Sequence, residues 1–289
     1  MVTRRSPQAE RIIGIINYLT VNPSDDGVTI AEIARRLGVN KATCYPMLEA
    51  LTEAGFLLRD PSRKTFNLGP AMIAAGNVAA KKDPRRELAR RTMLDMADEL
   101  NLTCWLVSAD DTHLRVIDQA WRSRRPIPMM RVGERVRMSP PLGSVFMAWA
   151  GQRRVERWLH EGLVPDAEYP LYLERMAGIR AAGYAVSLEE PTREYRVLAK
   201  QLSATTTPAE RALLRDQLTP DCTLGSHWLL TELEMDREYL ATSIDAPIFY
   251  GTGQVGLAIG VMMLPVLPGR DILKLGERVS AAARYISES

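Results

Sequence analysis

Residues 29–60 read TIAEIARRLGVNKATCYPMLEALTEAGFLLRD, and this stretch decides the fold of the N-terminal part of the chain. Thr29 is followed three residues later by Glu32, a capping-box pair that predicts the start of a helix. Gly38 should end that helix, because glycine tolerates the positive φ of a helix terminus. Asn40 is a good cap for a second helix, from Lys41 to Ala54. Two short helices joined by a glycine-containing turn are typical of a helix-turn-helix.

The flanking segments extend this pattern on both sides. Before it, residues 8–21 place Ile12, Ile15, Ile16 and Leu19 on one face of a predicted helix. After it, residues 56–60 and 65–69 are strand-like and are separated by the turn PSRK at 61–64. A helix, a helix-turn-helix and a hairpin with a basic tip together predict a winged helix. The helix pair alone would also fit an ordinary helical hairpin.

The charge is divided unevenly along the 289 residues, whose formal net charge is +2. Residues 1–91 hold 15 Lys and Arg against 9 Asp and Glu, and the remainder holds 22 against 26. This balance argues against a chain that coats nucleic acid along its whole length. Residues 1–69 alone carry 9 against 7, so the winged-helix pattern, and not the charge, indicates DNA binding.

Short polar or basic side chains at the start of a recognition helix can reach base edges and phosphates. Basic residues in a wing or an N-terminal arm can enter a minor groove or hold phosphates. For the arm and wing residues, a solvated surface charge is the alternative. The candidate DNA contacts are Arg4, Arg5, Thr29, Asn40, Lys41, Ala42, Thr43, Tyr45, Arg63 and Lys64.

The segment from Ala9 to about Gly76 resembles the IclR family of bacterial transcription regulators. The resemblance rests on TIAEIARRLGVNKATCY, on EALTEAGFLLRD and on NLGPAM, which opens a linker helix. It implies a repressor or other regulator that binds paired half-sites of a double-stranded DNA operator as a homodimer or homotetramer. The chain departs from the family at Pro46, where a basic residue is usual. A proline inside a helix predicts a kink or a late helix start at this point.

The C-terminal part predicts an α+β domain. Strands are expected at 102–110, 113–120, 127–132, 239–250 and 255–264, helices at 84–100 and within 152–183, and a closing helix at 269–287. The segments RVGERVRMSPPLGSVFMAWA, IRAAGYAVSLEE and SIDAPIFYGTGQVGLAIGV are similar to family motifs and imply a GAF-like, effector-binding fold. The expected domains are therefore a winged helix-turn-helix at 1–70, a linker helix at 71–84 and a GAF-like domain at 85–289. An insertion at about 190–240 would cover the pocket, add an oligomer contact or be a passive surface addition.

By resemblance, the effector pocket should lie between the sheet and the SPPLGS turn at 139–144. Ligand pockets are mostly apolar with a few oriented polar groups, and backbone N–H groups at a helix start suit a carboxylate. A small organic acid or an aromatic compound is therefore expected, although core packing is the alternative for the apolar members. The candidate effector-binding residues are Trp105, Met129, Met130, Ser139, Leu142, Gly143, Ser144, Asp221, Cys222, Ser243 and Asp245.

Other classes of protein find little support in the sequence. No GxSxG, HExxH, P-loop or GxGxxG motif is present, so no catalytic residue, metal or cofactor is expected. An enzyme acting on a small acid in the C-terminal domain is the alternative, as is a winged helix used only for protein contacts. The three scattered cysteines and the absence of an 18-residue apolar segment favour a cytoplasmic protein without a membrane partner.

Overall fold

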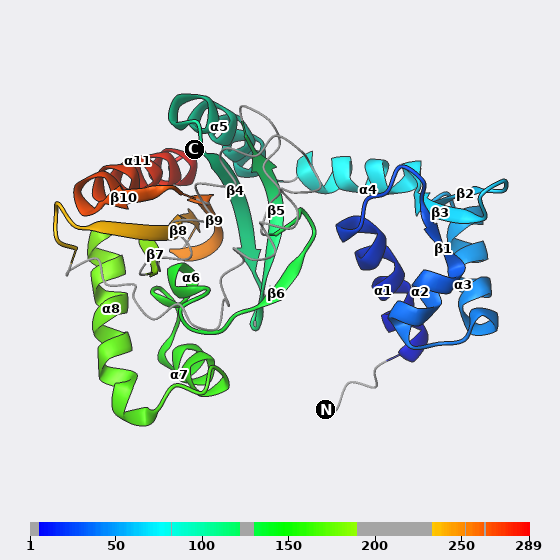
Figure 1. The fold of residues 1–289 in the computed structure, drawn as a ribbon, viewed down its shortest axis with the longest axis horizontal. Helices are drawn as coiled ribbons and strands as arrows, with labels where there is room; N and C mark the ends of the chain where they lie inside the picture. The colour runs from blue at the N-terminus through cyan, green and yellow to red at the C-terminus, as the bar shows by residue number, and fades with distance from the viewer. Residues whose placement is uncertain (1–5, 82, 122–129, 190–232, 252, 263) are drawn as a thin grey trace. The chain divides into compact units, whose positions relative to one another are not determined.

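The computed structural model describes residues 6–81, 83–121, 130–189, 233–251, 253–262 and 264–289, and it divides the chain into two compact units (Figure 1). Unit 1 extends to Glu87 and includes Arg131–Glu134, whereas unit 2 comprises Leu88–Met130 and Arg135–Ser289. The division falls within the helix that begins at Pro84. Most of the predicted insertion lies outside the described residues.

Unit 1 is a bundle of helices beside a small antiparallel sheet of order β1-β3-β2. Its shared core contains Ile15, Ile33, Leu48, Leu57 and Phe66. The helix-turn-helix and the hairpin are confirmed, while the two-residue strand β1 is too short to leave a periodic signal. The elements are α1 (Pro7–Val21), β1 (Val28–Thr29), α2 (Ile30–Leu37), α3 (Lys41–Glu53), β2 (Leu57–Asp60), β3 (Thr65–Leu68) and α4 (Pro70–Lys81).

Unit 2 is built on a seven-stranded antiparallel sheet of order β10-β8-β9-β4-β5-β6, in which β7 also pairs with β8. The long strands β8 and β9 form the predicted hairpin around Gly251 and Gly253. The strands are β4 (Thr103–Ala109), β5 (His113–Ala120), β6 (Arg135–Arg137), β7 (Ala185–Glu189), β8 (Glu238–Tyr250), β9 (Gln254–Met262) and β10 (Val266–Pro268).

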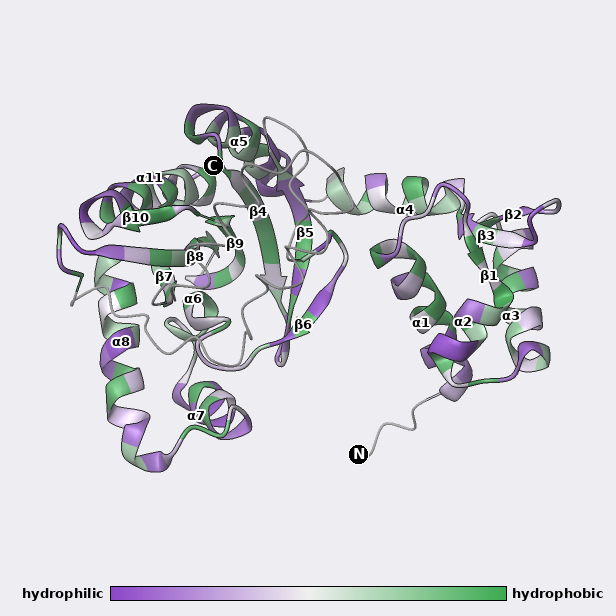
Figure 2. Cartoon of the chain, viewed as in Figure 1, coloured by the Kyte–Doolittle hydropathy of each residue, from purple (hydrophilic) through white to green (hydrophobic). Residues whose placement is uncertain are grey.

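Helices cover both faces of this sheet because successive residues of its central strands are apolar and point to opposite faces (Figures 1 and 2). Cys104 and Leu106 of β4 face the cluster that includes α5 (Pro84–Leu100) and α11 (Gly269–Ser287). Trp105 and Val107 face the opposite cluster. That second cluster is closed by α6 (Ser144–Met147), α7 (Gln152–Glu161) and α8 (Tyr169–Ala182), with a 3-10 turn at Asp166–Glu168 between the last two. The α+β class is confirmed.

One expectation about the C-terminal part of the chain is corrected. The strand expected at 127–132 is wrong for Met130–Val132, which form a bend and the start of a turn. The side chain of Met130 is buried there without any strand pairing of its backbone. The edge strand is instead β6, after the turn that contains Gly133. No helix in the described residues is long and apolar enough to cross a membrane.

Candidate DNA interface and effector site

The two helices of the helix-turn-helix are fixed by the caps that the sequence predicts. Thr29 and Glu32 form a complete capping box: Thr29 N donates to Glu32 Oε2 at 2.8 Å, and Glu32 N donates to Thr29 Oγ1 at 3.3 Å. Thr29 Oγ1 also donates to Glu32 Oε2 at 2.7 Å, and this bond together with the one from Thr29 N lowers the pKa of Glu32. Gly38 ends α2 with a φ of 65°, and Asn40 Oδ1 accepts from Thr43 N at 2.7 Å at the start of α3. The side-chain acceptors of Thr29 and Asn40 therefore serve the helices themselves.

Helix α3 presents one face to the core and the other to solvent. Cys44, Met47, Leu48 and Leu51 are buried. The candidate contacts Lys41, Ala42 and Tyr45 are exposed, and Thr43 is half-buried. The arrangement leaves the first two turns of α3 open to a duplex, as a recognition helix requires.

Pro46 lies on the exposed face of α3, six positions into the helix. The late helix start expected from this proline is wrong, because α3 begins at Lys41, directly after its Asn40 cap. The cap and the buried side of the helix therefore outweigh the missing Pro46 amide, which cannot donate to the carbonyl of Ala42. The exposed face carries one cation, Lys41, in these first turns.

The tip of the wing is held by acidic side chains. Asp60 Oδ1 accepts from Ser62 Oγ at 2.6 Å, from Ser62 N at 2.8 Å and from Arg63 N at 3.1 Å, and these bonds lower the pKa of Asp60. The guanidinium of Arg63 is bonded to Asp26, which precedes β1. Lys64 has a φ of 55° at the tip. Arg63 is thus already engaged by a carboxylate, while Arg4 and Arg5 lie outside the described residues.

Arg59 is a cation of this surface that the sequence reasoning missed. It is exposed on β2, with its guanidinium carbon 6.0 Å from the ring centre of Tyr45 and 5.9 Å from that of Phe66. The sequence does not show which face of β2 is buried, because Leu57 and Leu58 are both apolar. In the structure Leu57 is fully buried, and strand residues two apart share a face. Arg59 therefore leaves the sheet on the side of α3.

On unit 2, a row of residues crosses the sheet where the effector site is expected. In the register of β8, β9 and β4, Asp245 lies opposite Gly260, and Gly260 lies opposite Trp105. Trp105 Nε1 donates to Asp245 Oδ1 at 2.6 Å, and Ser243 Oγ donates to Asp245 Oδ2 at 2.7 Å. A Cβ on Gly260 would lie 2.1 Å from Asp245 Oδ1 and 2.7 Å from Trp105 Nε1. Because glycine has no side chain, Gly260 leaves room for Trp105 and the carboxylate of Asp245 to form their hydrogen bond across β9.

Asp245 is half-buried, and desolvation raises its pKa to about 6, while hydrogen bonds from Ser243 and Trp105 act in the opposite direction. The row continues onto β5, where Gln119 lies opposite Trp105 and is buried. Gln119 Nε2 donates to the carbonyl of Met130 at 2.7 Å. The structure therefore brings together Trp105, Met130, Ser243 and Asp245 of the predicted set and adds Gln119 and Gly260 to it.

The turn at 139–144 has a less open geometry than expected. The amide of Ser144 donates to the carbonyl of Pro141 at 3.1 Å, and α6 is only four residues long. Gly143 has a φ of 92°, and Ser144 is buried while Ser139 is exposed. The carbonyl of Leu142 accepts from Trp158 Nε1 at 3.2 Å. Helix α6 packs against β8 and β9, so Ser144 belongs to the same side of the sheet as Asp245.

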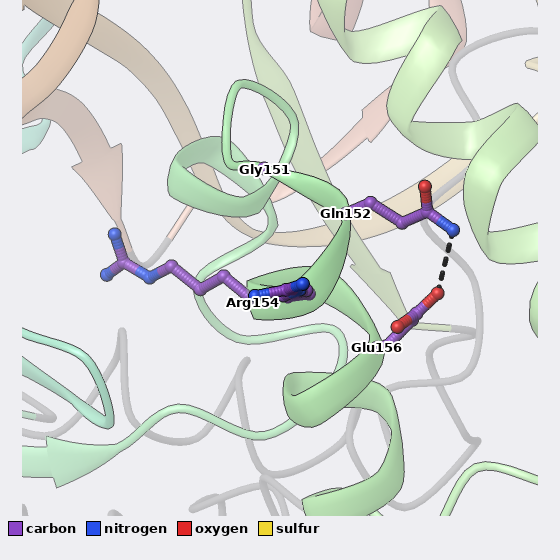
Figure 3. Close-up of a pocket in the computed structure, with 5 residues that line it drawn as sticks. Gly151, Gln152, Arg154 and Glu156 are labelled. Carbon is purple, nitrogen blue, oxygen red and sulfur yellow. Dashed lines mark hydrogen bonds between the residues drawn. The ribbon is translucent and has the colours of Figure 1, made fainter.

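A hollow of about 600 Å³ lies at the start of α7 and is not part of the predicted site (Figure 3). Within it Gln152 Nε2 donates to Glu156 Oε1 at 2.8 Å. The guanidinium of Arg154 donates to the carbonyl of Asp110 at 2.6 Å. Its lining residues are Gly151, Gln152, Arg153, Arg154 and Glu156.

Three predicted effector residues, Met129, Asp221 and Cys222, lie outside the described residues. Within the described ranges, no group of three or more His, Cys, Asp or Glu residues could hold a metal ion.

Comparison with known proteins agrees with this organisation. Residues 8–61 match the family model described as the IclR helix-turn-helix domain. The HTH-type transcriptional regulator BhcR of Paracoccus denitrificans (strain Pd 1222) is 24% identical over 200 residues, which cover 66% of this chain and 70% of that protein.

Solved structures share the fold over nearly the whole chain. An IclR transcriptional regulator from Alicyclobacillus acidocaldarius has a TM-score of 0.69 at 21% identity, covering 99% of both chains. An IclR homolog from Microbacterium hydrocarbonoxydans, solved in complex with 4-hydroxybenzoate, has a TM-score of 0.60 at 16% identity and covers 97% of this chain and 99% of its own. The Paracoccus and Alicyclobacillus proteins are described as transcriptional regulators.

Proposed function

We propose that this transcriptional regulator of the IclR type binds a specific double-stranded DNA operator through α3. A small organic acid or an aromatic compound would act as the effector that controls this binding. The observation that carries the proposal is the capped helix α3, whose first turns expose Lys41, Ala42 and Tyr45 while its other side is buried. Polar and basic side chains at this end of a recognition helix match the donors and acceptors of a major groove. In a bacterial cell the site of action would be the cytoplasm.

For the DNA side, we propose contacts by Lys41, Thr43 and Tyr45 from α3 and by Lys64 from the wing. Thr29 and Asn40 would act through the caps that set the direction of α2 and α3, with their flanking amides near the phosphates. Arg63 would add little net charge to this surface, because the carboxylate of Asp26 lies beside it.

We further propose that the protein acts as a homodimer or homotetramer, as palindromic operators require. Helix α4 supports this proposal, because its composition is apolar while most of its length is exposed (Figure 2). The side chains of Ile73 and Val78 are 67% and 61% exposed. Exposed apolar helices of this kind mark interaction surfaces, and a second copy would cover this one.

For the effector side, the supporting observation is the polar group on an otherwise apolar sheet face. Trp105 and Ser243 each donate a hydrogen bond to Asp245, and Trp105 belongs to the apolar cluster that includes Met138, Phe146 and Met262. Such a combination is typical of small-molecule sites. The 4-hydroxybenzoate found in the Microbacterium homolog makes hydroxybenzoates reasonable first probes.

The experiment combines both sides of the proposal. Duplexes covering the region upstream of the protein's own gene are titrated with the full chain by fluorescence anisotropy, with and without acids that raise its unfolding temperature. We expect the protein to bind one of these duplexes specifically at low salt, and the Kd for that duplex to change when a stabilising acid is present. If the protein bound none of these duplexes, the proposal of operator binding would be refuted. That result would favour a winged helix used for protein contacts.

Substitutions on the two faces of the sheet test where the effector binds. Ser243→Ala should weaken binding of the stabilising acid, because it removes a hydroxyl beside Asp245. Ser280→Ala is the matched control, since Ser280 is a buried serine on α11, which covers the opposite face of the sheet. Equal affinity of wild type and Ser243→Ala would place the effector elsewhere.

A further inference from the structure

The exposed face of α3 offers little positive charge to a duplex. In its first two turns Lys41 is the one cation, and Pro46 occupies an exposed position there. The wing does not supply the missing charge through Arg63, which is bonded to Asp26. A protein gains affinity for DNA by neutralising phosphates, so another cation near α3 would have a large effect.

Arg59 is placed to supply that charge. It lies on the edge strand β2, which packs against α3 (Figure 1). In register it is directly opposite Phe66, and its side chain follows the face of Leu57 toward the helix. Among the residues that the structure describes, it makes no ion pair with a carboxylate, in contrast to Arg63.

The guanidinium of Arg59 is also pre-positioned. Its central carbon is about equally distant from the ring centres of Tyr45, at 6.0 Å, and Phe66, at 5.9 Å. The Phe66 ring is buried and fixed by the core, while 40% of the surface of Tyr45 is exposed. Two rings on one cation restrict its rotamers, so less side-chain entropy remains to be lost when a phosphate binds.

We propose that Arg59 is a phosphate-binding residue of the DNA interface and that Tyr45 is its positioning residue, with the aromatic ring acting as the platform. Arginine suits this role because its planar guanidinium can stack on a ring while its N–H groups donate to phosphate oxygens. The contact carries no base specificity. It compensates for the low charge of α3 around Pro46. The inference rests on the proposed operator binding.

The test is the salt dependence of DNA binding by the full chain, measured by anisotropy on an upstream duplex and on an unrelated duplex of equal length. Arg59→Ala should weaken binding to both duplexes about 5- to 10-fold at 0.1 M salt. It should also reduce the slope of log K against log salt by about 0.9 per protomer. Arg59→Lys should retain most of the slope, because the charge remains. Arg63→Ala is the matched control from the same hairpin and should change the slope by less than half as much.

Tyr45 variants test the positioning role. Tyr45→Ala should reproduce part of the slope loss, and Tyr45→Phe should keep the wild-type slope. The combination of Tyr45→Ala with Arg59→Ala should have the same slope as Arg59→Ala alone, because the uncharged Tyr45 neutralises no phosphate itself. Circular dichroism melting of each variant verifies that unit 1 remains folded. An unchanged slope in Arg59→Ala would overturn the phosphate role, as would a loss restricted to the upstream duplex. If the wild type bound neither duplex, the operator proposal itself would fail.

Discussion

At the scale of single residues, Asp245 makes the stability of unit 2 depend on pH. Its pKa is raised from 3.8 to about 6 by burial, so between about pH 4 and pH 6 the folded protein holds a proton that the unfolded chain has released. The contribution of this group to the free energy of unfolding therefore falls as the pH rises through that window. Above pH 6 the full cost of a buried carboxylate is present.

Asp245→Asn should remove this cost and keep both hydrogen bonds, because an amide can accept from Trp105 and donate to Ser243. We expect a gain in the free energy of unfolding of up to about 3 kcal/mol at pH 7.5, shrinking toward zero at pH 4. Urea unfolding followed by tryptophan fluorescence measures it. The exposed Asp236, changed to asparagine, is the control and should show no such difference between the two pH values. A gain of equal size at both pH values would contradict the role of burial.

The position of Gly260 in β9 leaves no room for a side chain, which gives a second prediction for a single residue. A methyl group at this position would collide with Asp245 Oδ1 and with the carbonyl of Ile244, which would lie 2.1 Å and 2.5 Å away. Gly260→Ala should therefore cost about 1–3 kcal/mol, as overpacking of a core does, and should break the bond between Trp105 and Asp245. Denaturant unfolding gives the cost. Gly76→Ala, at an open position inside α4, is the control and should not destabilise the protein, because alanine is the better helix former there by about 0.5–1 kcal/mol. Wild-type stability of Gly260→Ala would mean that the side chains of Asp245 and Trp105 can move apart without loss.

Residues whose role is local could be predicted from the sequence, and those whose role is long-range could not. Thr29, Gly38 and Asn40 act on neighbours within four positions, so their side-chain chemistry is sufficient. Asp26 and Arg63 are 37 residues apart, and Trp105 and Asp245 are 140 apart. No local pattern predicts such a pair, although both members of the second pair were among the candidate effector residues.

At the scale of elements, Pro46 is a destabilising feature within the best-defined helix of unit 1. Pro46→Ala restores an amide that can donate to Ala42, and alanine has a higher helix propensity. Part of the gain is offset because proline also restricts the unfolded chain. We expect α3 to become more stable by about 1–2 kcal/mol.

Amide hydrogen exchange of α3 measures this change, because all five tryptophans lie at or beyond position 105 and fluorescence does not report on α3. Pro7→Ala is the matched control. Pro7 lies in the first turn of α1, where a proline is well tolerated, so protection of that helix should hardly change. Unchanged or lower protection of α3 in Pro46→Ala would show that the proline fits its helix without cost.

Long periodic elements were predicted almost to the residue, as the helix Gly269–Ser287 shows, because one face of it is buried along its whole length. The prediction of a strand at 127–132 failed at Met130–Val132, where Met130 is buried without strand pairing and Arg131 and Val132 are exposed. The order of the sheet also lay beyond the sequence, because β7 and β8 pair although 48 residues separate their ends. Such pairings are decided by packing over the whole domain.

At the scale of the whole molecule, control of DNA binding by an effector is a coupling between two sites. If a stabilising acid changes the Kd for the operator by some factor, the operator must change the Kd for the acid by the same factor. Isothermal titration of the acid with and without saturating duplex measures the reciprocal effect, and an unrelated duplex is the control. Different factors in the two directions would mean that the acid acts on DNA binding by a route other than this protein.

The central claim is that α3 binds duplex DNA, and a salt titration of the full chain on its upstream duplexes tests it most directly. Lys41→Glu reverses the one cation in the first turns of α3, while Lys274→Glu makes the same change on α11, where the side chain is 74% exposed. We predict binding by the wild type that weakens linearly in log salt, a loss of at least about 10-fold with Lys41→Glu, and little loss with Lys274→Glu. Equal binding by both variants, or no binding by the wild type at 50 mM salt, would contradict the claim.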